Sequence, residues 1–178
     1  MIGRFYARLG EVVEPLAPTS ALDAGCGEGE TLARLDCLPR GRTAAIDLSE
    51  QAVQHTRDRV PWADASVASV TDLPFEDGSF DLVLCLEVLE HLAEPEVALD
   101  ELARVASSDV VVSTPHEPWF QLGSLLRGKY LRGLGNHPEH VNHWNRRTLP
   151  ALLETRFREV RPVGAFPWLI AHCRGRRD

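Results

Sequence analysis

The chain has 178 residues, a formal net charge of −7 at pH 7 and 44% hydrophobic residues, which is typical of one soluble globular domain spanning residues 1–178. No apolar run is long enough to span a membrane, and the N-terminal MIGRFYARLGEVVEPL lacks the apolar core and cleavage site of a signal peptide. Four scattered cysteines without a C-x-x-C pair indicate reduced thiols in the cytoplasm, and the negative charge disfavours a nucleic-acid partner.

Apolar runs alternate with helical patterns along the first two thirds of the chain. The stretch GEVVEPL belongs to a first helix. Strands are expected within residues 19–25, 41–49, 64–70, 79–88 and 108–115, and helices over residues 29–35, 49–60 and 95–105. Ser49 is the expected N-cap of the second of these helices, and Pro95 lies in the first turn of the third. Strands this rich in Val, Leu and Ile favour a parallel sheet that is buried on both faces of an α/β domain.

The pattern changes after Pro115. Residues 116–145 are rich in Gly, His and aromatic residues and are predicted to form a lid or inserted segment. A helix is expected over residues 146–157, with Pro150 in its first turn, and two closing strands over residues 158–165 and 167–175.

A glycine-rich stretch, LDAGCGEG, separates the first predicted strand from the following helix. Glycines there permit tight turns and close approach to a ligand. The spacing is G-x-G-x-G rather than the G-x-G-x-x-G of dinucleotide enzymes, and Asp23, Glu28 and Glu30 surround it. Three carboxylates suit a ligand with sulfonium and ammonium groups better than a pyrophosphate.

Asp47 ends the second predicted strand. A carboxylate at that position can accept both hydroxyls of a ribose. The third predicted strand then leads, through SVTDLPFEDGSFDLVLCLEVLEHL, into the fourth.

The motifs LDAGCGEG, IDLS and LPFEDGSFDLVLCLEVLEHL together resemble those of the class I S-adenosylmethionine-dependent methyltransferases, most closely the branch that includes quinone-biosynthesis and other small-molecule enzymes. The resemblance covers Thr19 to Pro115. It implies a Rossmann-like three-layer sandwich with a mostly parallel seven-stranded sheet and an antiparallel last strand. It also implies S-adenosylmethionine as cofactor and S-adenosylhomocysteine as its product.

The resemblance further implies which residues contact the cofactor. Asp23 would order the glycine loop near the methionine part, Asp47 would bind the ribose hydroxyls, and Leu48 would pack on the adenine. The full expected set is Asp23, Gly25, Cys26, Gly27, Asp47, Leu48, Ser69, Val70, Leu86 and Glu87. Many relatives have an Asp where this chain has Ser69, so that hydroxyl or Asp72 would accept the adenine amino group. Cys26 is expected to be a small packing residue rather than a nucleophile.

A general base assists methyl transfer when the acceptor must lose a proton, and histidine has a suitable pKa. His140 in the predicted lid is the first candidate, followed by His116 after the fifth strand. His91 is the third, because it falls four residues after Glu87 and would share a helical face with it. The alternative is that Glu87 and His91 hydrogen-bond each other in a structural role.

The three histidines of HPEHVNHW have a spacing that could also bind a metal. No acidic or cysteine ligand accompanies them, so no metal is expected. The aromatic residues Trp119, Phe120, Tyr130 and Trp144 favour an apolar acceptor pocket within residues 116–145, and Phe5 and Tyr6 are placed to close over the cofactor.

We therefore expect a methyltransferase, monomeric or homodimeric, that acts on an O, N or C atom of a small-molecule acceptor. One alternative is a methyltransferase fold that has lost catalysis and serves as a binding or partner subunit. A nicotinamide oxidoreductase is a weaker alternative, because of the glycine spacing and the short chain.

Overall fold

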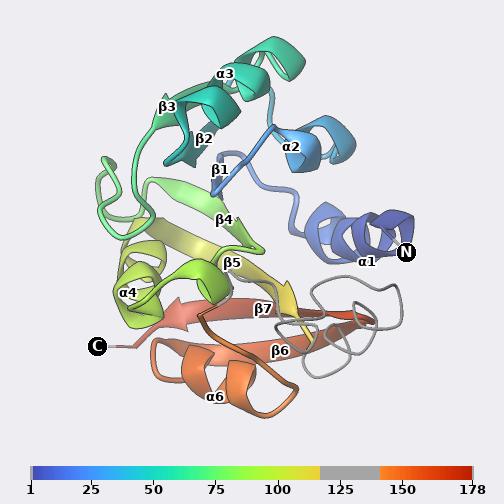
Figure 1. The fold of residues 1–178 in the computed structure, drawn as a ribbon, viewed down its shortest axis with the longest axis vertical. Coiled ribbons are helices and arrows are strands. Elements are labelled where there is room, and N and C mark those ends of the chain that lie inside the picture. The colour runs from blue at the N-terminus through green and yellow to red at the C-terminus, as the bar shows by residue number, and fades with distance from the viewer. Residues whose placement is uncertain (1, 117–140, 178) are drawn as a thin grey trace, which may run out of the picture.

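The structure is a computed structural model that describes residues 2–116 and 141–177. Within these residues seven strands form one sheet, in the order β3-β2-β1-β4-β5-β7-β6 (Figure 1). The strands are β1 (Ala21–Ala24), β2 (Thr43–Asp47), β3 (Asp64–Val67), β4 (Phe80–Leu86), β5 (Ala106–Pro115), β6 (Phe157–Ala165) and β7 (Trp168–Arg176). Neighbouring strands are parallel except that β7 runs antiparallel to both β5 and β6. The predicted sheet, mostly parallel with an antiparallel last strand, is confirmed.

Helices cover both faces of this sheet and produce the predicted three layers. The side chains of α1 (Ile2–Val13), α2 (Glu30–Arg34) and α3 (Glu50–Arg59) join one buried cluster, and those of α4 (Pro95–Val105) and α6 (Thr148–Leu153) join the other. Two short 3-10 helices, η1 (Glu14–Leu16) and η2 (Leu89–His91), complete the described elements. None of the helices described is long and apolar enough to cross a membrane.

Several element boundaries differ from the predicted ones. The third strand ends at Val67, because Ser69 and Asp72 form an isolated bridge that turns the chain away from the sheet. The last helix is shorter than expected and ends at Leu153, with Pro150 in its first turn. The predicted Ser49 cap is confirmed, since its hydroxyl accepts a 3.2 Å hydrogen bond from the Ala52 N–H. Most of the predicted lid lies outside the described residues.

The sheet order creates the place for a ligand. From β1 the chain continues on one side to β2 and β3 and, after β3, crosses to β4 on the other side of β1. In open α/β sheets, ligands bind beyond the carboxyl ends of the strands where the strand order reverses in this way. The loops after β1, β2 and β4 meet at this point.

The packing of α4 on the sheet can be tested with two residues of that helix. Leu99 is fully buried, whereas Val97 is 41% exposed. Leu99→Ala should lower the free energy of unfolding by about 2–5 kcal/mol, because it removes buried methyl groups and leaves a cavity. Val97→Ala should change it by less than about 0.5 kcal/mol. Urea unfolding measures both, and equal effects would contradict the placement of α4.

Candidate functional site

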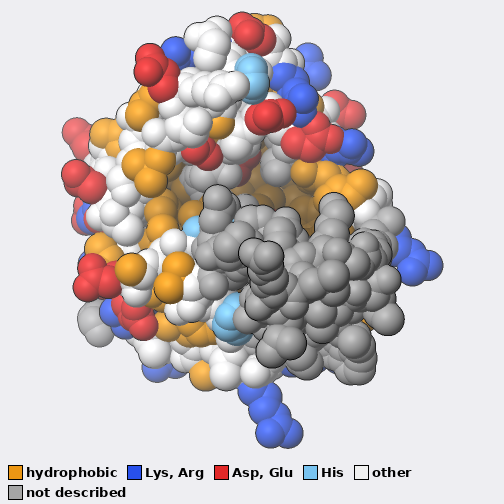
Figure 2. All heavy atoms as spheres, viewed as in Figure 1, with side chains coloured by type: hydrophobic (Ala, Val, Ile, Leu, Met, Phe, Trp, Pro, Cys, Tyr) orange, Lys and Arg blue, Asp and Glu red, His pale blue; other side chains and the backbone are white. Residues whose placement is uncertain are grey.

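A cavity of about 530 Å³ opens at the carboxyl ends of β1, β2 and β4. This volume is within the range of roughly 300–1,000 Å³ that is typical of small-molecule sites. Figure 2 shows a hollow on this side of the molecule, with hydrophobic side chains on its floor and acidic side chains along its upper rim. The lining residues are Ile2, Phe5, Tyr6, Gly25, Cys26, Gly27, Glu28, Glu30, Thr31, Ile46, Asp47, Leu48, Ala68, Val70, Leu86, Glu87, Val88, His91, Leu92 and Trp168.

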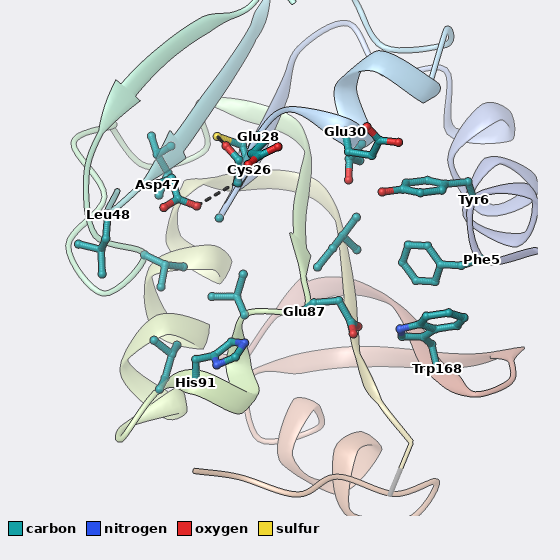
Figure 3. Close-up of a pocket in the computed structure, with 18 of the residues that line it drawn as sticks. Phe5, Tyr6, Cys26, Glu28, Glu30, Asp47, Leu48, Glu87, His91 and Trp168 are labelled. Atoms are coloured by element: carbon teal, nitrogen blue, oxygen red, sulfur yellow. Dashed lines mark hydrogen bonds between the residues drawn. The ribbon is translucent and has the colours of Figure 1, made fainter. Parts of the chain in front are cut away.

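The glycine loop after β1 is held by the end of β2. The N–H groups of Gly25 and Cys26 both donate to the Ile46 carbonyl, at 2.8 and 2.9 Å. The Gly27 N–H donates to Oδ2 of Asp47 at 2.9 Å (Figure 3). Asp47 therefore holds this loop in place, and the predicted ordering role of Asp23 stays a prediction.

Gly25 is required because the loop passes very close to the residue after Glu87. A Cβ atom at Gly25 would lie 2.3 Å from Cγ2 of Val88, and the φ angle of Gly25 is +93°. Gly27 also has a positive φ, +51°, but a Cβ atom there would meet no atom within 4 Å. Packing against Val88 thus requires a glycine at residue 25, whereas only the backbone conformation favours a glycine at residue 27.

Asp23 lies at the end of β1 and is 1% exposed. Its Oδ2 atom has no hydrogen-bond partner among the described residues. Burial, with repulsion from Asp47 as a smaller contribution, raises the pKa of Asp23 to about 7. A buried carboxyl without a cation is costly when ionised, so this group is suited to a ligand that brings positive charge.

Asp47 presents a carboxylate to the cavity with spare hydrogen-bonding capacity. Oδ1 accepts from the Ser49 N–H and Oδ2 from the Gly27 N–H, both at 2.9 Å. A carboxylate has about four acceptor positions, so each oxygen can still accept one more hydrogen bond. Leu48, which is 69% exposed, follows it at the cavity edge.

The predicted contact of Ser69 is not supported by its position. The Ser69 hydroxyl is 2.7 Å from that of Thr71 and is not among the cavity-lining groups. Its neighbours Ala68 and Val70 line the cavity instead, so this wall is apolar. Cys26 lines the cavity as a packed thiol, and burial raises its pKa to about 12, which agrees with the predicted packing role.

Leu86 and Glu87, at the end of β4, both line the cavity as predicted. Oε1 of Glu87 accepts a 2.7 Å hydrogen bond from the Ser113 hydroxyl of β5. Its carboxyl group points toward Trp168 on β7 (Figure 3). The carboxyl is thus held by the neighbouring strand β5 and faces the ring of Trp168.

The three candidate histidines have different positions. His91 lines the cavity, but Glu87 has a φ of +58° and precedes η2, so the predicted shared helical face is wrong. His116 is buried against Phe166 and does not line the cavity. Burial and the nearby Arg146 lower the pKa of His116. His140 lies outside the described residues, and its catalytic role stays a prediction.

Trp168 is the main lining residue that sequence reasoning missed as part of the site. The sequence predicted only that Trp168 lies in the last strand. In the structure, its pairing with Pro115 brings it to the carboxyl end of β5. Its ring packs on Phe5 of α1, with centroids 5.3 Å apart. Phe5 and Tyr6 reach the cavity as predicted. No group of three or more His, Cys, Asp or Glu in the described ranges could hold a metal ion.

Comparisons with known proteins agree with this geometry. Residues 22–113 match the family described as "Methyltransferase domain". A probable S-adenosylmethionine-dependent methyltransferase of Mycobacterium tuberculosis is 34% identical over 173 residues, which cover 93% of this chain and 60% of that protein. A ubiquinone biosynthesis O-methyltransferase of Xanthomonas oryzae pv. oryzae is 39% identical over 98 residues, 51% of this chain and 39% of that protein. The chain thus spans 60% of the length of the first relative and 39% of the second, less than two thirds of either.

Among solved structures, the magnesium protoporphyrin IX methyltransferase of Synechocystis PCC 6803, with bound SAH, has the same fold. The TM-score is 0.69 at 17% sequence identity, over 97% of this chain and 81% of that one.

The different roles of the two glycines predict different costs of substitution. Gly25→Ala should lower the free energy of unfolding by more than about 3 kcal/mol, because strain at positive φ adds to the clash with Val88. Gly27→Ala should cost only about 1–2 kcal/mol. Chemical denaturation of both variants checks this order, and the reverse order would contradict the loop geometry.

The raised pKa of Asp23 predicts a pH dependence. In the folded protein Asp23 keeps its proton up to about pH 7, whereas in the unfolded chain it ionises near its ordinary value of 3.8. Its contribution therefore favours folding below about pH 4 and is lost as the pH rises to about 7. The unfolding free energy of the wild type should fall, relative to Asp23→Asn, by roughly 4 kcal/mol over this range. Urea unfolding of both proteins measures the difference, and a constant difference would refute the shift.

Proposed function

Because the chain belongs to the S-adenosylmethionine-dependent methyltransferase family, as its match over residues 22–113 shows, we propose that it binds S-adenosylmethionine in the cavity described above and methylates a small-molecule acceptor. The observation that carries this proposal is Asp47, a carboxylate at the end of β2 that faces the cavity beside an open glycine loop.

The residues present fit this cofactor. Both oxygens of Asp47 have an acceptor position left for the two ribose hydroxyls, and Leu48, Ala68 and Val70 offer apolar surface to an adenine. The Oδ2 atom of Asp23, which has no partner among the described residues, is buried near the end of β1, where its carboxyl would stabilise an ammonium group of the ligand. When bound, the cofactor supplies a methyl group already activated on a sulfonium.

The protein's contribution to the reaction is mainly orientation. Gly25 and Gly27 let the backbone approach the ligand, and Asp47 fixes its ribose end. The apolar rings of Phe5 and Trp168 shield the other end from water. Alignment of nucleophile, methyl and sulfur can supply several kcal/mol of the barrier.

A small acceptor is supported by charge and by the relatives. A net charge of −7 is unfavourable for a nucleic-acid acceptor. The Xanthomonas relative is named as an O-methyltransferase of ubiquinone biosynthesis, which supports a small-molecule acceptor. The apolar wall formed by Phe5 and Trp168 is compatible with an aromatic or lipid-like acceptor.

Calorimetric titration with S-adenosylhomocysteine tests the proposal. Wild-type protein should bind it at micromolar concentration, and NADH should not bind. Asp47→Asn should weaken binding about 10- to 100-fold, because each hydrogen bond to a charged acceptor contributes about 1.5–3 kcal/mol. The control Asp36→Asn, at a side chain that is 95% exposed, should leave the affinity unchanged. Absence of binding to the wild type, or equal effects of the two variants, would contradict the assignment.

A further inference from the structure

Glu87 lines the cavity and has a positive φ angle, which is unusual for a residue other than glycine. It is one of two non-glycine residues with positive φ in the described ranges, the other being Ala17 in the turn after η1. Such conformations cost energy and gather at functional sites. Here the turn follows β4 directly, and Val88 then packs against Gly25, so the glycine loop and Glu87 are adjacent walls of the cavity.

Among the described residues, the carboxyl of Glu87 is held by a neutral group. The Ser113 hydroxyl donates to it at 2.7 Å, and the carboxyl points toward Trp168 (Figure 3). No Lys or Arg occurs among the described residues that line the cavity. Within the described part of the chain, an ionised Glu87 thus has a hydrogen-bond donor but no neighbouring cation to offset its burial, and this burial raises its pKa.

The carboxyl of Glu90 is a second buried acid, and it interacts with Glu87. Glu90, on η2, is 2% exposed, and its Oε2 atom has no hydrogen-bond partner among the described residues. Burial and repulsion from Glu87 both raise the pKa of Glu90. The carbonyl of Glu90 accepts hydrogen bonds from the N–H groups of Val141 and Asn142, which keeps this turn in place. Two buried carboxyls this close do not both ionise readily, so the pair retains a proton.

We propose that Glu87 is the proton-accepting residue of the site, ionised when a sulfonium occupies the cavity and protonated once the methyl group has been transferred. This inference rests on the proposed function, which fixes the nucleoside end of the ligand at Asp47 and so directs its other end toward Glu87 and Trp168. None of the three histidines of the sequence analysis is needed for this role.

The charges balance over the reaction. The acceptor's O–H or N–H bond breaks, and its proton passes to an oxygen of Glu87. The electron pair left on the acceptor forms the new bond to the methyl carbon, and the C–S bond breaks with its electrons on sulfur. The sulfonium thus becomes a neutral thioether as the carboxylate becomes a neutral acid. The proton then leaves to solvent before the next cycle.

Other titratable groups face the same region and must be separated from Glu87. Those that line the cavity are His91 on η2, Tyr6 on α1 and the acids Glu28, Glu30 and Asp47 around the glycine loop. Glu90 on η2, Asp23 on β1 and His116 after β5 are buried next to lining residues. S-adenosylmethionine and S-adenosylhomocysteine share the ammonium, carboxylate and ribose, and they differ in the charge of the sulfur. A difference between the two ligands therefore isolates groups that respond to the sulfonium.

The test is calorimetric titration with both ligands near neutral pH, in phosphate and in Tris, which gives the number of protons released on binding. Wild-type protein should release on the order of half a proton more with S-adenosylmethionine than with S-adenosylhomocysteine. Glu87→Gln should abolish this difference while still binding S-adenosylhomocysteine. Glu90→Gln should preserve the difference, because Glu90 holds the retained proton of the pair and is already neutral when Glu87 ionises. Glu76→Gln, at an exposed acid in the loop before β4, should preserve it.

Equal proton release with the two ligands, or a difference that persists in Glu87→Gln, would overturn the inference while leaving the proposed function intact. Failure of the wild type to bind either ligand would overturn both.

Discussion

The hydrogen bonds between the glycine loop and the end of β2 are the constraint on which the site depends. Ile46 accepts two N–H groups of the loop through its carbonyl, and Asp47 accepts a third through its side chain. On the other side, Gly25 packs directly on Val88, which follows β4. The loop after the central strand β1 is thus connected to the carboxyl ends of both neighbouring strands, β2 and β4, and these contacts define one side of the cavity.

Much of the fold could be predicted, because the strands are buried on both faces and read as continuous apolar runs. β1 and β4 illustrate this, with almost every residue buried, and so does β5 from Asp109 onward. The insertion of β7 between β5 and β6 was not predicted, since it results from tertiary pairing that local patterning does not show. Only the antiparallel last strand came from the family resemblance. Element ends were less accurate where a side chain or a proline changed the backbone, as at Ser69 and Pro150.

The site residues could be predicted where one short motif determines both the residue type and its position in the fold. The glycines and Asp47 were found because both the backbone and the carboxylate are required at strand ends. The hydrogen bond of Asp47 to the loop was not predicted, since which acid contacts the loop depends on side-chain direction. The prediction that Glu87 and His91 share a helical face was wrong, because the positive φ of Glu87 is incompatible with a helix there. Trp168 was missed because it reaches the cavity only through the pairing of β7 with β5.

The described part of the site offers carboxyl groups but no cationic side chain. Asp47 and Glu87 line the cavity and Asp23 is buried near the end of β1, whereas no Lys or Arg is among the described lining residues. Such a lining favours a ligand that carries positive charge, such as a sulfonium, and disfavours a pyrophosphate.

A crystal structure of the complex with S-adenosylhomocysteine would test this account most directly. The account predicts that the ribose hydroxyls donate to Asp47, that the ammonium lies within hydrogen-bond distance of Asp23 or the adjacent loop, and that the sulfur faces Glu87. A ligand bound elsewhere, or one whose sulfur lies on the far side of the cavity from Glu87, would contradict it.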